Sequence, residues 1–274
     1  MPLQLKCTAA SRLPIDFAGI IPERIRGHSL AEIERTEIFC GNRRLPLVEL
    51  FSVAGESADG GIHLTGDLSS VHGIGCGMTQ GVIRIEGSAG RHLGAEMRGG
   101  RIDVFGDAGD WAGAEMRGGA IHVHGNVADH AAGAFPGSLR GMTGGELLVA
   151  GNAGDNAGTA MRRGLVAIGG SAGDGLGSRM IAGTIIVGGQ CGRHAGAAMR
   201  RGTIVLMNPA SNGAMQLLPT FVRANQWNPP FLRLLLVNLQ SAGFVQAERW
   251  IDSDYIVHHG DQLALNRGEI LVRV

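Results

Sequence analysis

The chain has 274 residues, enough for one large domain or two modest ones, and 46 of them are glycine. A hydrophobic content of 44% excludes a disordered glycine-rich linker, and a formal net charge of zero argues against a nucleic-acid binder that works through bulk charge. The four cysteines form no CxxC pair, and no apolar run is long enough to cross a membrane. We therefore expect a cytoplasmic protein with no nucleic-acid or membrane partner.

The first sixty residues carry no repeat. Two segments are strand-like, TEIFC at 36–40 and LPLVELFSV at 45–53, and a turn at Gly41–Asn42 separates them. Their position ahead of a repeat array predicts a β-rich N-terminal cap over residues 1–60, because the open end of such an array needs a cover.

Residues 61–207 form a glycine-rich repeat. Four of its six spacings are 19 residues and the other two are 21 and 26, with units that begin at Gly66, Gly87, Gly106, Gly125, Gly151, Gly170 and Gly189. Glycine recurs at offsets 0, 3 and 7 in the five units that begin at Gly87, Gly106, Gly151, Gly170 and Gly189, whereas the unit at Gly125 has Ala128 and Ala132 instead. Nineteen residues are too few for a strand and a crossover helix. The repeat predicts an all-β fold, a right-handed parallel β-helix of about seven coils.

The apolar positions keep register with the glycines. Offset 10, corrected for the insertions, is always methionine: Met78, Met97, Met116, Met142, Met161, Met180 and Met199. Offsets 15 and 17 are always aliphatic, as in Ile102 and Val104, and this alternation predicts a strand with one buried face. We expect the methionines to fill an irregular interior, and the glycines to serve corners that need a positive φ or close backbone approach.

The last segment, 208–274, is predicted to be a C-terminal α+β cap. NPPFLRLLLVNLQSAGF predicts a helix near 229–242, with Asn228 as the N-cap, Pro229 in the first turn and Gly243 as the terminator. A short strand, Glu269 to Val274, closes the chain.

Rows of charged residues accompany the coils. Four aspartates occupy offset 4, with Arg91 and Arg193 at the ends of the row: Asp110, Asp129, Asp155 and Asp174. These aspartates either satisfy backbone N–H groups at their own corners or hold a cation or a basic strip of a partner. Offset 11 carries arginines, which form either a solvated face or a strip that binds an acidic surface or polyanionic chain: Arg98, Arg117, Arg162 and Arg200, with Arg163 and Arg201 adjacent.

Two further features are candidate sites. His122 and His124 alternate on one strand, and we interpret them as surface histidines, because no third metal ligand is near in sequence. The seven extra residues before Met142 form an excursion in which Phe135 and Leu139 would need a covering partner. No nucleophile with a base and no phosphate-binding loop is evident, so we expect no catalytic, cofactor-binding or metal-ligating residue on this chain.

The G-xx-G-xxx-G coils resemble the GXGXG domain found at the C-terminus of the glutamate synthase large subunit and in the C subunit of formylmethanofuran dehydrogenase. EIFCGNRRLPLVELFSVAGE at 37–56 and YIVHHGDQLALNRGEILV at 255–272 look like the flanks of that C subunit, so the resemblance covers essentially the whole chain. The sequence is most similar to the C subunit of the bacterial formyltransferase/hydrolase complex, a preference that the arginine-rich, lysine-poor composition supports.

The resemblance implies a non-catalytic assembly subunit. In the hydrolase complex, a formyl group moves from tetrahydromethanopterin to a methanofuran-type carrier and is hydrolysed to formate. The family's carrier bears a glutamate-containing tail, so the resemblance implies that the arginine strip either guides this anionic arm or holds an acidic partner surface: Arg98, Arg117, Arg162 and Arg200. The implied partners are amidohydrolase-like and formyltransferase chains and a chain like the family's B subunit, with a zinc-type metal on another subunit. Three alternatives remain open: the C subunit of a tungsten or molybdenum formylmethanofuran dehydrogenase, a glutamate synthase-type module, and an independent β-helix enzyme such as a polysaccharide lyase.

Overall fold

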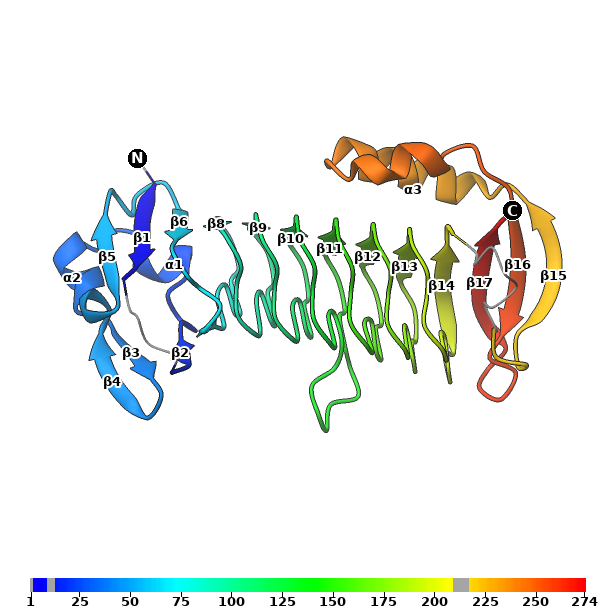
Figure 1. The fold of residues 1–274 in the computed structure, drawn as a ribbon, viewed down its shortest axis with the longest axis horizontal. Helices are drawn as coiled ribbons and strands as arrows, with labels where there is room; N and C mark the ends of the chain where they lie inside the picture. Colours follow the sequence, from blue (N-terminus) through cyan, green and yellow to red (C-terminus); the bar gives the residue numbers. More distant parts are fainter. Residues whose placement is uncertain (1, 9–12, 209–216) are drawn as a thin grey trace.

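The computed structural model describes residues 2–8, 13–208 and 217–274. The chain is elongated: a row of stacked coils occupies its middle, and additional strands and helices lie at the two ends (Figure 1). One side of every coil contributes a strand to a thirteen-stranded, largely parallel sheet. Helices are few, so the protein is mainly β. No helix of the described residues has both the length and the apolar character that a membrane crossing needs.

The coils repeat with the period of the sequence. Neighbouring strands pair in parallel and in register, so that Ile102, Ile121 and Leu147 lie side by side. A second parallel ladder of single bridges runs through Ala89, Ala108 and the equivalent residue of each later coil. The strands of the stack are β6 (Gly61–Thr65), β8 (Val82–Glu86), β9 (Arg101–Val104), β10 (Ala120–Val123), β11 (Glu146–Val149), β12 (Leu165–Ile168), β13 (Thr184–Val187) and β14 (Arg201–Leu206).

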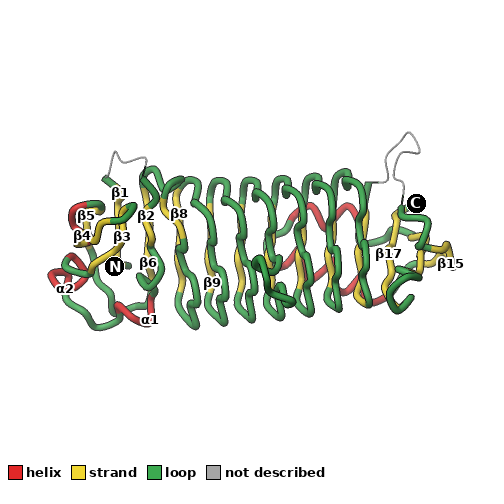
Figure 2. Tube along the Cα trace, turned by 90° about the horizontal axis from the view of Figure 1, so that it is seen from below, coloured by secondary structure: helices red, strands yellow, loops and turns green. Residues whose placement is uncertain are grey.

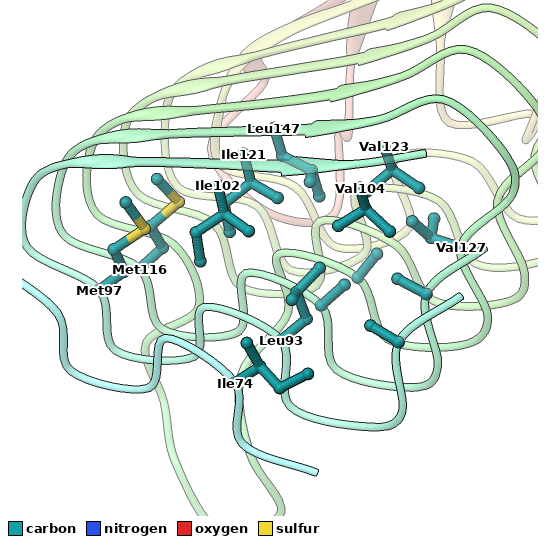
Figure 3. Packing of buried hydrophobic residues seen from close by; sticks show 14 of the residues in the cluster. Ile74, Leu93, Met97, Ile102, Val104, Met116, Ile121, Val123, Val127 and Leu147 are labelled. Carbon is teal, nitrogen blue, oxygen red and sulfur yellow. The ribbon is translucent and has the colours of Figure 1, made fainter. Parts of the chain in front are cut away.

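The interior of the stack is built from columns of like residues. All seven methionines of offset 10 are fully buried, and Figure 3 shows Met97 and Met116 lying side by side next to the column of Ile102, Ile121 and Leu147. Each methionine also reaches the next coil. A Cβ at Gly119 would lie 2.7 Å from the Met97 methyl carbon. The long unbranched side chain therefore fills the space that the missing Cβ of a glycine leaves one coil further on.

The glycines of the repeat have two distinct uses. Gly113, at offset 7, has φ +64°, a left-handed conformation that glycine adopts without a steric penalty. Gly109, at offset 3, has no positive φ, but a Cβ there would lie 2.9 Å from the Gly90 carbonyl carbon of the preceding coil. Left-handed residues other than glycine also occur at offsets 5 and 9 in four of the coils, for example Trp111 and Glu115.

The N-terminal elements extend one end of the stack. β1 (Leu3–Cys7) pairs in parallel with β6, and β5 (Phe51–Ala54) pairs antiparallel with β1 and forms the sheet edge. A second sheet has the order β4-β3-β2-β7, with β2 (Ile15–Asp16), β3 (Glu37–Cys40), β4 (Arg43–Pro46) and β7 (Val71–His72). The remaining elements are α1 (Pro22–Ile25), α2 (Leu30–Glu34) and η1 (Leu47–Glu49). The N-terminal segment is thus mainly strand, with two short helices.

The C-terminal segment continues the sheet. β17 (Arg267–Arg273) pairs in parallel with β14 as a further rung, and β16 (Tyr255–Gly260) and β15 (Val222–Trp227) follow in antiparallel pairing. Between them, α3 (Pro230–Ser241) and η2 (Val245–Trp250) fold back along the outside of the stack, as the helix at the top of Figure 1 shows. The tail therefore does more than cover an end, because it also shields one flank of the coils.

The helix α3 corrects two predictions. Its N-cap is Pro229, with Pro230 in the first turn and no side-chain capping bond, so the assignment of Asn228 as N-cap is wrong by one residue. The prediction that the strands bury only one face is wrong for β11 to β14. Their outward residues Leu148, Ala167, Ile186 and Val205 are buried beneath Leu232, Leu236 and Leu239 of α3. In the coils that α3 does not cover, the same position holds Arg84 and Asp103.

Candidate functional site

The aspartates of offset 4 form a ladder between coils. The backbone N–H of Asp155 donates to Asp129 Oδ1 at 2.8 Å, and the N–H of Asp174 donates to Asp155 Oδ1 at 2.8 Å. The expectation that each carboxylate serves its own corner is therefore wrong, because each one accepts from the coil that follows. Arg91 pairs with Asp110 at 3.1 Å and Arg193 pairs with Asp174 at 2.9 Å, so an arginine side chain lies at each end of the row.

A second polar ladder runs parallel to the first. The N–H of Asn126 donates to Asp107 Oδ1, the N–H of Asn152 to Asn126 Oδ1 at 2.8 Å, and the N–H of Ser171 to Asn152 Oδ1 at 2.8 Å. This ladder was not predicted from the sequence, although offset 1 is polar in all these coils. Both ladders satisfy backbone N–H groups at a corner of the stack, which gives them a structural role.

Aromatic rings stack at offset 5, where the left-handed backbone turns side chains outward. The ring centroids of His92 and Trp111 are 5.5 Å apart, those of Trp111 and His130 are 4.8 Å apart, and both pairs are nearly parallel. Phe135 packs against His92 and Trp111 and is half-buried. The excursion loop thus uses Phe135 to hold itself against the stack. Desolvation by burial lowers the pKa of His92, so this ring stays neutral at pH 7.

The arginine row and the excursion loop meet at one surface. Arg117 and Arg162 line a hollow of about 490 Å³ beside the loop, and Arg162 and Arg200 line a second hollow of about 690 Å³. Leu139 borders the second hollow and is 75% exposed. Of the residues predicted for partner contact, Arg117, Arg162, Arg200 and Leu139 thus lie together. Arg98 is exposed but lines neither hollow.

The same surface contains residues that were not selected from the sequence. Arg179 and Ile181 come from the coil between those of Arg162 and Arg200, and Arg140 comes from the loop. Leu263 and Leu265 come from the turn between β16 and β17, more than sixty residues beyond the coils they approach. Arg179 occupies offset 9 of its coil, so its place in the repeat is evident from the sequence. No feature of the sequence around Leu263 and Leu265 indicates that they lie near this surface.

The histidines of β10 differ from one another. His122 is only 8% exposed, so the interpretation of both residues as surface histidines is wrong for it. Its ring lies 3.1 Å from Arg101 Nη2 and within 3.8 Å of Asp103 and Glu146. The nearby His122 ring lowers the pKa of Glu146. His124 is exposed and stacks on Phe105 at 4.6 Å.

The arginine side chains of this surface are suited to binding an anionic partner. Among the described residues, no three His, Cys, Asp or Glu side chains gather as metal ligands would. Burial raises the pKa of Cys191 to about 12 and raises that of Cys76 above its ordinary value, so both thiols are protonated at neutral pH. The arginine surface, in contrast, offers several permanent charges and exposed leucines in one concave area.

Comparison with known proteins gives the chain its relatives. A chain in the crystal structure of the formyltransferase/hydrolase complex (FhcABCD) from Methylorubrum extorquens, in complex with methylofuran, superimposes with a TM-score of 0.90 at 35% identity, covering 99% of both chains. The C subunit of molybdenum-containing formylmethanofuran dehydrogenase 1 from Methanothermobacter thermautotrophicus is 42% identical over 84 residues, 30% of this chain and 21% of the relative.

The C subunit of tungsten-containing formylmethanofuran dehydrogenase 2 from Methanothermobacter marburgensis is 38% identical over 87 residues, 30% of this chain and 32% of the relative. These matches thus span about a fifth to a third of the curated relatives. The family defined by the GXGXG motif matches residues 58–229, which is more than half of the chain. The chain therefore belongs to the GXGXG motif family and is homologous to the C subunit of formylmethanofuran dehydrogenase.

Proposed function

We propose that this chain is the C subunit of a formyltransferase/hydrolase complex of one-carbon metabolism. In this complex a formyl group passes from tetrahydromethanopterin to a methanofuran-type carrier and is then hydrolysed to formate. The observation that carries the proposal is the full-length match to a chain of FhcABCD, with 99% coverage and a TM-score of 0.90. The match includes both ends as well as the repeat, and glycine-rich coils alone would not produce it.

The role proposed for this subunit is assembly, with the reaction on other chains. The coils bury their methionines and aliphatics inward and use the polar ladders to satisfy the backbone, which leaves a long and regular outer surface for neighbours. We expect amidohydrolase-like and formyltransferase partners and a chain like the family's B subunit, with the carriers and a zinc-type metal bound outside this chain.

The architecture proposed for this role is a right-handed parallel β-helix. The in-register parallel ladders support the helix, and the strong preference of parallel crossovers for right-handed connection supports the hand. We divide the chain into an N-terminal cap at 1–60, the coils at 61–207 and a C-terminal cap at 208–274.

A second candidate is the C subunit of a tungsten or molybdenum formylmethanofuran dehydrogenase, which the local identity of 38–42% to two such subunits favours. Affinity purification of the tagged chain from its native host, with mass spectrometry and metal analysis, separates the candidates. We expect an amidohydrolase-like and a formyltransferase chain with zinc. Tungsten or molybdenum with abundant iron would support the dehydrogenase, and a chain that purifies without either set of partners would refute both.

A further inference from the structure

A concave, arginine-rich surface lies where the excursion loop meets the coils. Figure 2 views the stack from the side from which this loop projects. It joins the two hollows of about 490 and 690 Å³, which share Arg162. We name it the arginine groove, and its lining includes Arg117, Arg140, Arg162, Arg163, Arg179 and Arg200 together with Leu139, Ile181, Leu263 and Leu265. The groove thus combines residues of four coils, the loop and the β16–β17 turn.

The positive charge of the groove is not balanced within the chain. Glu115 is the one acidic residue of its described lining. Of its six arginines, only Arg117 lies within ion-pair distance of a described carboxylate, Glu96 at 3.8 Å. Several arginines elsewhere on the stack are paired much more closely, as Arg101 is with Asp103 at 2.7 Å. Because the whole chain has no net charge, this excess is a local property of the groove.

Several of these groups are poorly satisfied in the chain by itself. The Nε atom of Arg162 is buried and has no hydrogen-bond partner, and its neighbours in the row carry the same charge, so they repel it. The leucines are unusually open to solvent, with Leu263 87% and Leu139 75% exposed. A partner with carboxylates would neutralise the arginines, and its apolar side chains would remove the leucines from water.

From this charge and apolar pattern, we propose that the arginine groove binds an extended acidic segment of another subunit, in which aliphatic side chains alternate with Asp or Glu. The proposal rests on the proposed function, since it requires a partner chain. Arg117 and Arg200 are four coil steps apart, roughly 19 Å, which about six residues of extended chain would span. Arginine pairs with carboxylates through two parallel hydrogen bonds, and the leucines supply the apolar contact that a nucleic acid or a simple anion would not use.

The test uses the native complex with variants of the tagged chain. Arg162→Glu with Arg200→Glu should reduce the amount of partner recovered at least about tenfold, because each reversal replaces attraction by repulsion. Leu139→Ala with Leu263→Ala should reduce recovery mainly at high salt, where the apolar contact carries more of the binding. Arg43→Glu with Arg223→Glu, at exposed arginines outside the groove, is the matched control and should leave recovery unchanged. Unchanged thermal melting would show that each variant is folded, and Arg200→Gln serves as a milder variant.

The identity of the occupant is read from a photo-crosslinking residue placed at position 263. Support requires crosslinks to a partner segment with at least three acidic residues, lost in the Arg162→Glu, Arg200→Glu variant. Crosslinks to nucleic acid, to a basic or neutral segment, or to no polymer would overturn the proposal. If the partners co-purify equally with all variants, the groove is refuted while the proposed function stands. If no formyl-transfer partner co-purifies with the parent chain, both fail.

Discussion

Replacement of Gly106 by alanine tests whether close packing between coils, and not only turn geometry, requires glycine. The backbone at Gly106 has no positive φ, so an alanine there would be free of torsional strain. Its Cβ, however, would lie 2.6 Å from the Gly87 carbonyl carbon and 2.7 Å from the Ser88 nitrogen. Ordinary van der Waals contact begins near 3.4 Å, and the atoms in the way are all backbone.

The coil cannot move aside without breaking its ladder. The N–H of Phe105 donates to the Ile85 carbonyl at 2.9 Å, and the Gly106 carbonyl accepts from the N–H of Gly125 at 3.0 Å. Overpacking against a rigid neighbour costs about 1–3 kcal/mol and occasionally more, and we place this case at about 3 kcal/mol because no rotatable side chain can yield. For a chain of this size that corresponds to a fall in Tm of about 6–12 °C.

The matched control is Gly137→Ala in the excursion loop. Gly137 has φ +85° and nothing within 4 Å of the point where a Cβ would lie, so it pays only the torsional penalty of about 1–2 kcal/mol. Thermal melting of both variants and the parent, followed by circular dichroism, gives the comparison. If Gly106→Ala melts within 2 °C of the parent, or no lower than Gly137→Ala, the inference that coil spacing forbids a Cβ is wrong.

Four further predictions concern the core, the polar ladder, its dependence on pH and the helix cap. Met116→Ala should lower the free energy of unfolding by about 2–5 kcal/mol, whereas Met116→Leu, which nearly conserves the volume, should cost less than about 1.5 kcal/mol in the same melting assay. Asp155→Asn should melt like the parent because it keeps the acceptor for the next coil, whereas Asp155→Ala should melt about 2–4 °C lower. The pKa of Asp174 lies below its ordinary value of 3.8, chiefly because of the hydrogen bond from the backbone of Arg193. The ionised Asp174 carboxylate therefore stabilises the folded chain above pH 3.8, and this stabilisation is lost as the pH falls through the lowered pKa. The difference in Tm between the parent and Asp174→Ala should close in that acid range, and a difference that widens would contradict the assignment. Asn228→Ala should change the free energy of unfolding by less than about 0.5 kcal/mol, because this residue does not cap α3. A larger loss would indicate that Asn228 is the N-cap.

The repeat could be predicted from the sequence because each of its signals is local. The spacing of the glycines, the methionine at offset 10 and the aliphatics at offsets 15 and 17 all appear within one unit and recur in the next. The same holds for the aspartate and arginine rows. The hydrogen bonds of these rows are harder to predict. An aspartate oxygen can accept an N–H from its own turn or from the following coil, and only the distance between coils in the structure distinguishes the two.

Other features depend on segments that meet only in the folded chain. The outward residues of the strands are polar in the first coils and apolar in the later ones: Arg84, Asp103 and His122, then Leu148, Ala167, Ile186 and Val205. This change indicates that a further segment covers the later strands, but it does not indicate which segment. The structure supplies α3 as that cover. It also brings Leu263 and Leu265 of the C-terminal turn to the arginine row, which no spacing within the repeat predicts.

The coils, their period and the residues that line them can be read from the sequence, because units of similar sequence make similar contacts with their neighbours. Which segment covers the flank of the stack, and where the arginine groove lies, become evident only from the folded chain. Those features arise from the non-repeating ends, and the position of such an end on a uniform stack depends on long-range packing and not on any local preference of its residues.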